Sequence, residues 1–340
     1  MTTAIVILNW NGEQMLARFL PSVVAHSAGA QVIVADNGST DGSVALLETR
    51  FPSVRLIRLD HNYGFAEGYN QALQLVDADY YLLLNSDVEV PEGWLDPLVG
   101  CLDANADVAA CQPKILCEWD RSRFEYAGAA GGYIDSLGYP FCRGRIFDTV
   151  EPDRGQYDTP VDVFWATGAA LLIRREVYWA VGGLDGRFFA HQEEIDLCWR
   201  LRARGHRIMC VPSSQVYHVG GGTLPKANPR KTFLNFRNNL LLLYKNLPDA
   251  QLQRVMWRRW WLDALASVVF LLKGEWRSFR AVWHAHREFR KMRPHFRPDR
   301  VANLKAAVRT TIPEMYAGSI LWAYHVRRKK LFSSLVFHLF

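Results

Sequence analysis

The sequence predicts an α/β fold: a Rossmann-like, mostly parallel open sheet flanked by helices, followed by a helical C-terminal region. Two observations predict it. Short apolar runs alternate with segments of helical spacing over the first 90 residues, and polar clusters follow the apolar runs. The composition, with 49% hydrophobic and 22% charged residues among 340, is that of a globular protein and excludes wholesale disorder.

The N-terminal part is predicted to alternate strand and helix. Four short apolar runs are the predicted strands, at residues 4–8, 31–35, 54–59 and 80–84. Apolar residues at helical spacing predict the intervening helices, at residues 13–25, 43–50 and 65–76. Because parallel strands end at one edge of a sheet, the polar residues that follow them should gather there. Open α/β sheets bind their ligands at that edge.

The remainder is predicted to be less regular and then helical. Residues 117–160 are rich in Gly, Tyr and Arg and predict loops with short strands. Further elements are expected as a strand at 161–174 broken at Gly168, a helix at 193–205 and a strand at 207–211. From about residue 232 the pattern is helical to the end of the chain.

Charge divides the chain near the same point. Residues 226–340 contain 23 Lys and Arg but 6 Asp and Glu, whereas residues 1–225 contain 17 and 28. The sequence therefore predicts an α/β domain over 1–225 and a basic, aromatic-rich helical region over 226–340. The six cysteines show no CxxC pairing, which favours reduced thiols in the cytoplasm. The N-terminus indicates a buried strand, and no apolar run reaches the roughly 18–20 residues of a membrane span.

Three polar clusters carry candidate chemistry. Asp36, at a strand end, can accept a hydrogen bond from a nucleotide base or ribose, although such residues also cap helices and shape turns. Asp87 can bind a divalent cation that bridges a diphosphate. Glu194 and Asp196 lie in an acidic segment that can take a proton, or that simply decorates a helix N-terminus.

The clusters occur in an order that resembles a known family. The matching segments are 7–12, 34–43, 62–70, 84–87, 167–169, 182–185, 193–200 and 216–218. Together they resemble the GT-A-fold, family 2 inverting glycosyltransferases, especially the bacterial rhamnosyltransferase-like branch. The resemblance covers roughly residues 4–245. Each segment alone is weak evidence for the family, but the eight segments in this order are specific to it.

The resemblance implies a role for each cluster. Asp36 would bind the nucleotide base, Asp87 and His218 would hold Mg²⁺ or Mn²⁺, and Glu194 would be the catalytic base. The other nucleotide-sugar residues it implies are Asn9, Asn11, Asn37, Asn62, Gly64, Asn70, Asn85 and Ser86. The acceptor residues expected are Trp165, Gly168 and Asp196. Two positions depart from the family pattern, since Asn85 replaces the first Asp of the DXD motif and Glu194 replaces the catalytic Asp.

The basic C-terminal region predicts a peripheral membrane surface. Arginines recur there among Trp and Leu residues at helical spacing, and residues 327–330 form a further basic run. Such helices suit an anionic membrane interface. A solvated helical domain is the plainer interpretation, and nothing resembles a module that reads nucleic acid.

The sequence thus predicts a metal-dependent glycosyltransferase at the inner face of the cell membrane. We expect it to move a sugar, with rhamnose from dTDP-rhamnose as the first guess, to a saccharide or lipid-linked acceptor of a cell-surface glycan. One alternative is a non-catalytic nucleotide-sugar-binding assembly partner, which Asn85 and Glu194 favour. A nucleotidyltransferase would need a basic residue in a Gly-rich loop, which residues 9–12 lack. A homo-oligomer is left open.

Overall fold

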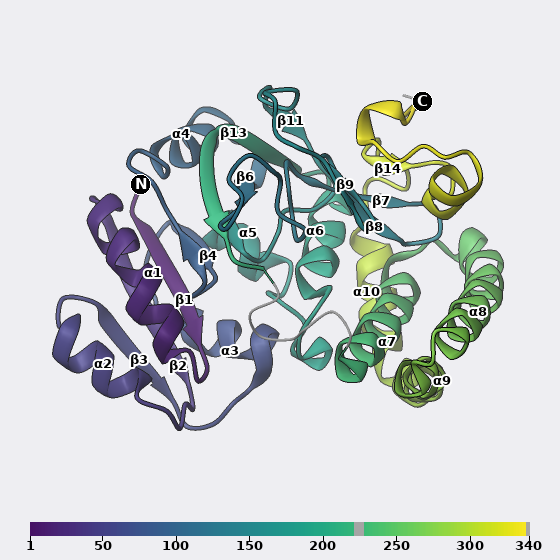
Figure 1. The fold of residues 1–340 in the computed structure, drawn as a ribbon, viewed down its shortest axis with the longest axis horizontal. Helices are drawn as coiled ribbons and strands as arrows, with labels where there is room; N and C mark the ends of the chain where they lie inside the picture. The colour runs from purple at the N-terminus through teal and green to yellow at the C-terminus, as the bar shows by residue number, and fades with distance from the viewer. Residues whose placement is uncertain (221–227, 338–340) are drawn as a thin grey trace.

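The computed structural model describes residues 1–220 and 228–337 and contains a nine-stranded main sheet (Figure 1). Its strands are β1 (Thr3–Asn9), β2 (Ala30–Asn37), β3 (Arg55–Leu59), β4 (Tyr80–Leu84), β5 (Val88–Glu89), β6 (Val108–Cys117), β11 (Val161–Asp162), β12 (Ala170–Arg174) and β13 (Arg207–His218). The order is β11-β13-β6-β12-β4-β1-β2-β3, with β5 paired to β13. Strands β1, β2, β3, β4, β6 and β13 run the same way, so the sheet is mostly parallel as predicted.

Helices cover both faces of this sheet, which explains why its central strands are continuously apolar. The helices before the C-terminal region are α1 (Glu13–His26), α2 (Ser43–Arg50), α3 (Gly64–Leu73), α4 (Asp96–Ala104), α5 (Arg175–Ala180) and α6 (Glu193–Ala203). Leu16 of α1 and Leu98 of α4 pack into the core on one face. Leu73 of α3 and Leu197 of α6 pack into the core on the other.

A small second sheet joins the middle of the chain to its end. Its strands are β7 (Gly132–Asp135), β8 (Pro140–Cys142), β9 (Arg145–Ile146), β10 (Thr149–Val150) and β14 (Met315–Tyr316). The order is β10-β9-β8-β7-β14, and β14 pairs with β7 in parallel. Residues 117–160 therefore contain the short strands that their composition predicts.

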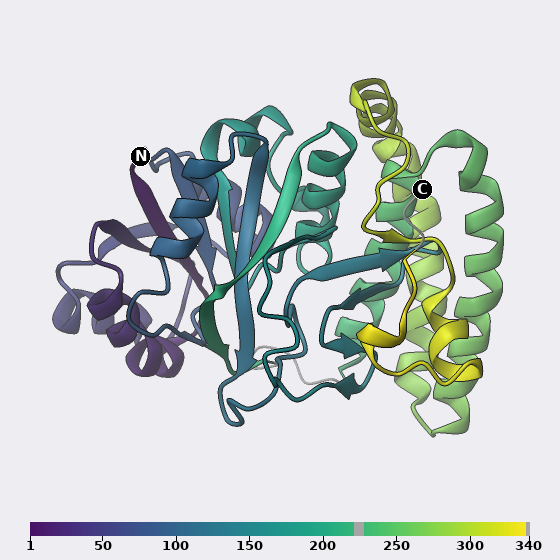
Figure 2. The ribbon, with the colours of Figure 1, turned by 90° about the horizontal axis from the view of Figure 1, so that it is seen from above.

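Four helices pack beside this second sheet at the end of the molecule opposite β3 (Figure 2). They are α7 (Pro229–Asn246), α8 (Asp249–Leu272), α9 (Trp276–Met292) and α10 (Arg297–Ala306). Helix α9 packs against both α7 and α8, and α8 lies outermost. Within the described ranges, no helix combines the length and hydropathy needed to cross a bilayer.

Three expectations about the elements are wrong in detail. The strand expected at 161–174 is interrupted between β11 and β12, because Thr167 bonds instead to Gln112 and Ala127. The strand expected to end at residue 211 continues to His218 after an irregularity in its pairing with β6. The C-terminal region is not helical to its end, since β14 follows α10. Elements β5, α4 and β6 were not anticipated.

A buried charged network fixes α8 to α9 and to the second sheet. Asp263 accepts hydrogen bonds from Arg259 at 3.1 Å and contacts His286 at 2.9 Å, and all three side chains are buried. Arg259 also donates to the carbonyl oxygen of Leu137 at 3.0 Å and to Asn239 of α7. Buried charges are tolerated when their partners satisfy them in this way.

Removing the carboxylate of this network should destabilise the protein strongly. We expect Asp263→Ala to lower the free energy of unfolding by about 3–5 kcal/mol, because it leaves the Arg259 guanidinium buried and unpaired. Urea titration followed by Trp fluorescence measures it. Asp107→Ala, which breaks an exposed ion pair with Arg207, is the control and should cost about 0–1 kcal/mol. Equal losses in the two variants would contradict the assignment.

Candidate active site

The carboxyl ends of β1 and β2 bring the first predicted residues together. Asn9 pairs with Asp36 across the two strands, and its amide donates to Asp36 Oδ1 at 3.2 Å. Asp36 Oδ2 accepts from the Ser39 backbone N–H at 3.0 Å, which folds the following loop over the strand end. Asn11 Oδ1 accepts from the Thr40 backbone N–H at 2.7 Å. Asn9 and Asp36 are buried, and Asn9 Oδ1 has no hydrogen-bond partner in the described residues.

The turn before α3 forms the next wall of this edge. Asn37 donates to the Gly64 carbonyl oxygen at 2.9 Å and accepts from the Tyr63 N–H at 3.0 Å, while Asn62 accepts from the Gly64 N–H at 2.8 Å. Gly64 has φ +81°, and a Cβ there would lie 2.5 Å from the Phe189 ring. Only glycine fits this position, because both the backbone angle and the space forbid a side chain.

Asn70, predicted as a nucleotide-sugar residue, makes its described hydrogen bonds inside the fold. Its amide donates to the Leu184 carbonyl oxygen at 2.7 Å, and its oxygen accepts from Tyr178 at 2.6 Å and from the Leu184 N–H at 3.1 Å. Both ends of the side chain are therefore used to attach α3 to residues 183–184. In the sequence, an Asn at this position looks the same whether it binds a nucleotide sugar or attaches a helix to a neighbouring loop.

Asp87 and His218 come together from distant parts of the chain. His218 ends β13, which pairs with β5, and its Nε2 lies 3.1 Å from Asp87 Oδ1 and 3.4 Å from Asn85 Nδ2. His218 Nδ1 lies 3.3 Å from Glu125. Burial disfavours the imidazolium, but Asp87 and Glu125 raise the pKa of His218 to about 10. Burial likewise opposes ionisation of Asp87, yet His218 holds the pKa of that carboxyl below its usual range.

The Asp87–His218 pair suits one edge of a divalent metal site. In the described residues no group of three His, Cys, Asp or Glu side chains could hold a metal ion, and this pair offers two donor atoms. The two donor atoms lie 3.1 Å apart, a hydrogen-bonding distance, and both could bind a cation when the imidazole is neutral. A carboxylate with an imidazole fits Mn²⁺ somewhat better than Mg²⁺.

The backbone before α6 has an unusual conformation. Phe189, His191 and Gln192 all have positive φ, between 67° and 71°, in a region that non-glycine residues rarely adopt. Helix α7 holds them there: the Asn238 amide donates to the carbonyl oxygens of Phe188, Ala190 and His191 at 2.7–3.1 Å. Such strain persists where surrounding contacts enforce it, and it is concentrated at functional sites.

This segment presents two acidic side chains at the start of α6. Glu193 is buried and Glu194 partly buried, and one oxygen of each has no hydrogen-bond partner in the described residues. Burial raises the pKa of Glu194 to about 7. Burial and the neighbouring Glu194 raise the pKa of Glu193 well above its ordinary value. A carboxylate poised near neutrality is suited to accept a proton.

The Glu194 segment lies beside the end of β4. The Asn85 N–H donates to the Ala169 carbonyl oxygen at 3.0 Å. A Cβ on the preceding Gly168 would lie 3.9 Å from Glu194 Cβ and 3.3 Å from Phe65. Gly168 therefore lies between the Asn85–Asp87 motif and Glu194, and its role toward an acceptor stays a prediction.

The other two predicted acceptor residues, Trp165 and Asp196, lie inside the fold. Trp165 is buried, and its indole N–H donates to the Tyr133 carbonyl oxygen at 2.9 Å. Asp196 has 0% exposure and lies 2.7–2.9 Å from the side-chain nitrogens of Lys245, Asn246 and Arg200. Neither side chain offers a surface to a sugar, because internal packing and ion pairs occupy both. The i+2 spacing from Glu194 already turns Asp196 toward the core.

Comparison with known proteins assigns this arrangement to a family. The family model described as "Glycosyl transferase family 2" matches residues 4–182, more than half of the chain. The chain belongs to glycosyl transferase family 2. This family 2 protein is 30% identical over 231 residues to an N-acetylglucosaminyl-diphospho-decaprenol L-rhamnosyltransferase of Mycobacterium tuberculosis, covering 63% of this chain and 75% of the relative.

Another relative is also similar in sequence, and a solved structure shares the fold. Rhamnosyltransferase WbbL of Escherichia coli is 27% identical over 223 residues, covering 63% of the family 2 chain and 82% of WbbL. The crystal structure of GalNAc-T7 with UDP, GalNAc and Mn²⁺ aligns with a TM-score of 0.55 at 17% identity. The match covers 72% of this chain and 47% of GalNAc-T7, and it supports the fold.

Two residues that contact the candidate site were not predicted from the sequence. Glu125 contacts His218 from a loop of irregular composition, and a single Glu there has no periodicity that would distinguish it. Asn238 lies on α7 next to Asn239. The cluster Asn238-Asn239 inside an apolar helical run was the available clue, because buried amides need specific partners.

The raised pKa of Glu194 predicts a pH-dependent cost to stability. Between the ordinary carboxyl pKa and about 7, the folded state keeps a proton that the unfolded chain has released, so stability falls as pH rises. We expect Glu194→Gln to raise the free energy of unfolding by about 1–3 kcal/mol at pH 8 and hardly at pH 4.5. Urea titration at both pH values measures this change in the free energy of unfolding.

A matched control is Glu48→Gln, which alters an exposed ion pair with Arg58 on the surface. That variant should change stability by less than about 1 kcal/mol at either pH. A stabilisation by Glu194→Gln that is equal at pH 4.5 and pH 8 would show that the carboxylate is not perturbed.

Proposed function

We propose that this protein is an inverting, metal-dependent glycosyltransferase that moves a sugar from a nucleoside-diphosphate donor to a saccharide or lipid-linked acceptor. The observation that carries the proposal is the approach of Glu194 to the Asn85–Asp87 motif through Gly168 and Ala169. A proton acceptor of raised pKa then lies beside the residues suited to the metal and diphosphate. An inverting transfer needs that combination, because the acceptor hydroxyl attacks in one displacement.

Each residue has a distinct part in the proposed reaction. Asp36 binds the nucleotide base at the ends of β1 and β2, with Asn9, Asn11, Asn37, Asn62 and Gly64 shaping that wall and Asn85 and Ser86 near the ribose. Asp87 and His218 hold a divalent cation, Mn²⁺ or Mg²⁺. When bound, that ion offsets the charge that develops on the departing nucleoside diphosphate. Glu194 takes the acceptor hydroxyl proton, and its longer side chain keeps the carboxylate that the family pattern places there.

The named relatives favour a particular donor and acceptor. Both are rhamnosyltransferases, and the name of the mycobacterial relative includes a diphospho-decaprenol-linked sugar. We therefore propose dTDP-rhamnose as the first donor to test, and a lipid-linked saccharide of a cell-envelope glycan as acceptor.

A lipid-linked acceptor requires contact with a membrane, and the C-terminal helices suit that contact. Helix α8 exposes Trp257 by 67%, Trp261 by 55% and Leu272 by 81%. Arg254 and Arg258 are exposed on the same helix. Aromatic rings with flanking arginines favour an anionic membrane interface. We propose that residues 226–340 attach the catalytic part, residues 1–225, to the cytoplasmic face of the cell membrane.

Release of a nucleoside diphosphate from a panel of UDP-, GDP- and dTDP-sugars tests the proposed activity. We expect slow, metal-dependent release from one donor, abolished by EDTA. Asp87→Ala should remove the metal dependence together with most of the rate. Glu194→Gln should lower the rate of transfer about 10²–10⁴-fold, because no group then accepts the proton. Nucleotide binding without any release, even with membrane extract added, would favour a non-catalytic binding partner instead.

The pH profile is a separate test of the Glu194 role. Because Glu194 must be deprotonated to accept a proton, kcat/KM should rise tenfold per pH unit up to about pH 7 and then level off. Glu194→Asp keeps a carboxylate and should retain a pH-dependent rate at reduced magnitude. A profile that is flat from pH 5 to pH 8 in the unmodified protein would exclude Glu194 as the base.

A further inference from the structure

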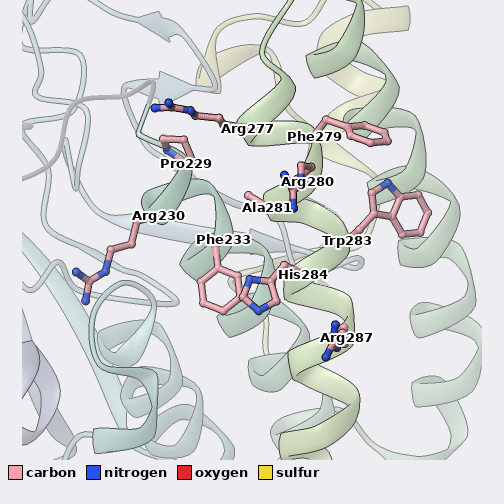
Figure 3. Close-up of a pocket in the computed structure, with 10 residues that line it drawn as sticks. All are labelled: Pro229, Arg230, Phe233, Arg277, Phe279, Arg280, Ala281, Trp283, His284 and Arg287. Carbon is pink, nitrogen blue, oxygen red and sulfur yellow. The ribbon is translucent and has the colours of Figure 1, made fainter.

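An arginine-lined pocket between α7 and α9 has no role in the reaction described above. Its volume is about 810 Å³. Four guanidinium groups line it, those of Arg230, Arg277, Arg280 and Arg287, together with His284. No acidic side chain contributes to the lining. Figure 3 shows Arg277 reaching from the start of α9 toward the start of α7.

The arginines of this pocket have no acidic partners in the described part of the chain. All four arginines are exposed, and none has an ion pair with any residue in the described ranges. Elsewhere in the same region Arg259 and Arg300 are buried and paired with Asp263 and Asp249. Four free guanidinium groups around one cavity favour a multiply charged anion, because each can bind phosphate oxygens in a bidentate manner.

The remaining walls of the pocket are apolar, which distinguishes it from a site for a small soluble anion. Phe233 of α7 stacks on His284 of α9, with ring centroids 4.7 Å apart. Phe279 and Trp283 also line it. The ring of Trp283 lies 6.3 Å from that of Trp260, which belongs to the exposed aromatic face of α8. The pocket is thus continuous with the surface proposed to enter the membrane interface.

The opposite end of the pocket leads to the catalytic segment. The Arg230 guanidinium lies 5.1 Å from the centre of the Phe189 ring. Phe189 contacts Gly64 and begins the strained turn that ends at Glu194. A ligand in the pocket therefore lies between the membrane-facing helix and the proposed base.

We propose that this pocket binds the diphosphate of a lipid-linked acceptor, with the sugar directed toward Glu194 and the apolar chain toward α8. The proposal rests on the proposed function, since it specifies the acceptor of that reaction. The phosphates of such a lipid lie at headgroup level, where interfacial Trp side chains also lie. Arg277 and Arg280 are the residues that would contact them most directly.

Vesicle binding by the full chain tests this proposal. One set of phosphatidylcholine vesicles carries a polyprenyl diphosphate, and the other carries phosphatidylglycerol at the same surface charge. We expect the unmodified protein to bind the diphosphate vesicles about tenfold more tightly. The double variant Arg277→Ala/Arg280→Ala should lose this preference, whereas Arg254→Ala/Arg258→Ala, with the same charge change on α8, should weaken binding to both sets equally.

Two results would overturn the proposal: equal binding of the two vesicle sets by the unmodified protein, or a preference that survives in Arg277→Ala/Arg280→Ala. Inorganic pyrophosphate provides a third arm. If it abolishes the preference at concentrations similar to that of the lipid, the pocket binds a soluble phosphate ligand and the lipid assignment fails.

Nucleotide release separates this proposal from the proposed function. Nucleotide release from the donor is measured on the unmodified protein without acceptor, so that its outcome does not depend on the proposed acceptor pocket. If the unmodified protein releases nucleotide normally but shows no preference for the diphosphate vesicles, only the pocket proposal is refuted. Absent release in the unmodified protein refutes the glycosyltransferase proposal, and the vesicle result then stands as a measurement of lipid binding.

Discussion

The geometry of the site depends on how helix α7 satisfies the carbonyl groups of Phe188, Ala190 and His191. Residues 188–192 belong to neither sheet, and the positive φ angles of Phe189, His191 and Gln192 turn the backbone away from regular hydrogen bonding. Unpaired buried carbonyls are costly, so some other element must supply the donors. Asn238 does so with one amide, and Asn239 binds the side chain of Gln192. The orientation of Glu194 at the next turn follows from these contacts.

The same helix neutralises the buried acids behind the site. Lys245 of α7 lies 2.7 Å from both Asp185 and Asp196, and Arg200 of α6 lies 2.9 Å from Asp196. Burial disfavours ionisation of Asp196, but Lys245 and Arg200 lower its pKa below the ordinary value. Glu193 and Glu194 lie on the same helix as Asp196 but have no such partners among the described residues, and their pKa values are raised. The α6 N-terminus thus contains ion-paired carboxylates and carboxylates of raised pKa within four residues.

Much of this could be predicted from the sequence, because strand ends in a parallel sheet meet at one edge. Asn9 and Asp36 are adjacent in register for that reason, and the order of motifs placed Asp87 near His218 across 130 residues. Asn70, Trp165 and Asp196 show the limit of prediction from residue type. Their residue types suit a ligand or a core equally well, and tertiary partners alone decide between them. The end of the chain was mispredicted because β14 is two residues long and pairs with a distant strand.

The pairing of β14 with β7 has a consequence for how this protein is made. Met315 lies opposite Ile134, so the two strands are separated by roughly 180 residues of chain. During synthesis the α/β core can close long before β14 leaves the ribosome, and until then β7 presents an unpaired edge. A nascent chain therefore carries a nearly complete main sheet beside an unfinished second one. The second sheet is completed only after residues 315–316 have been synthesised.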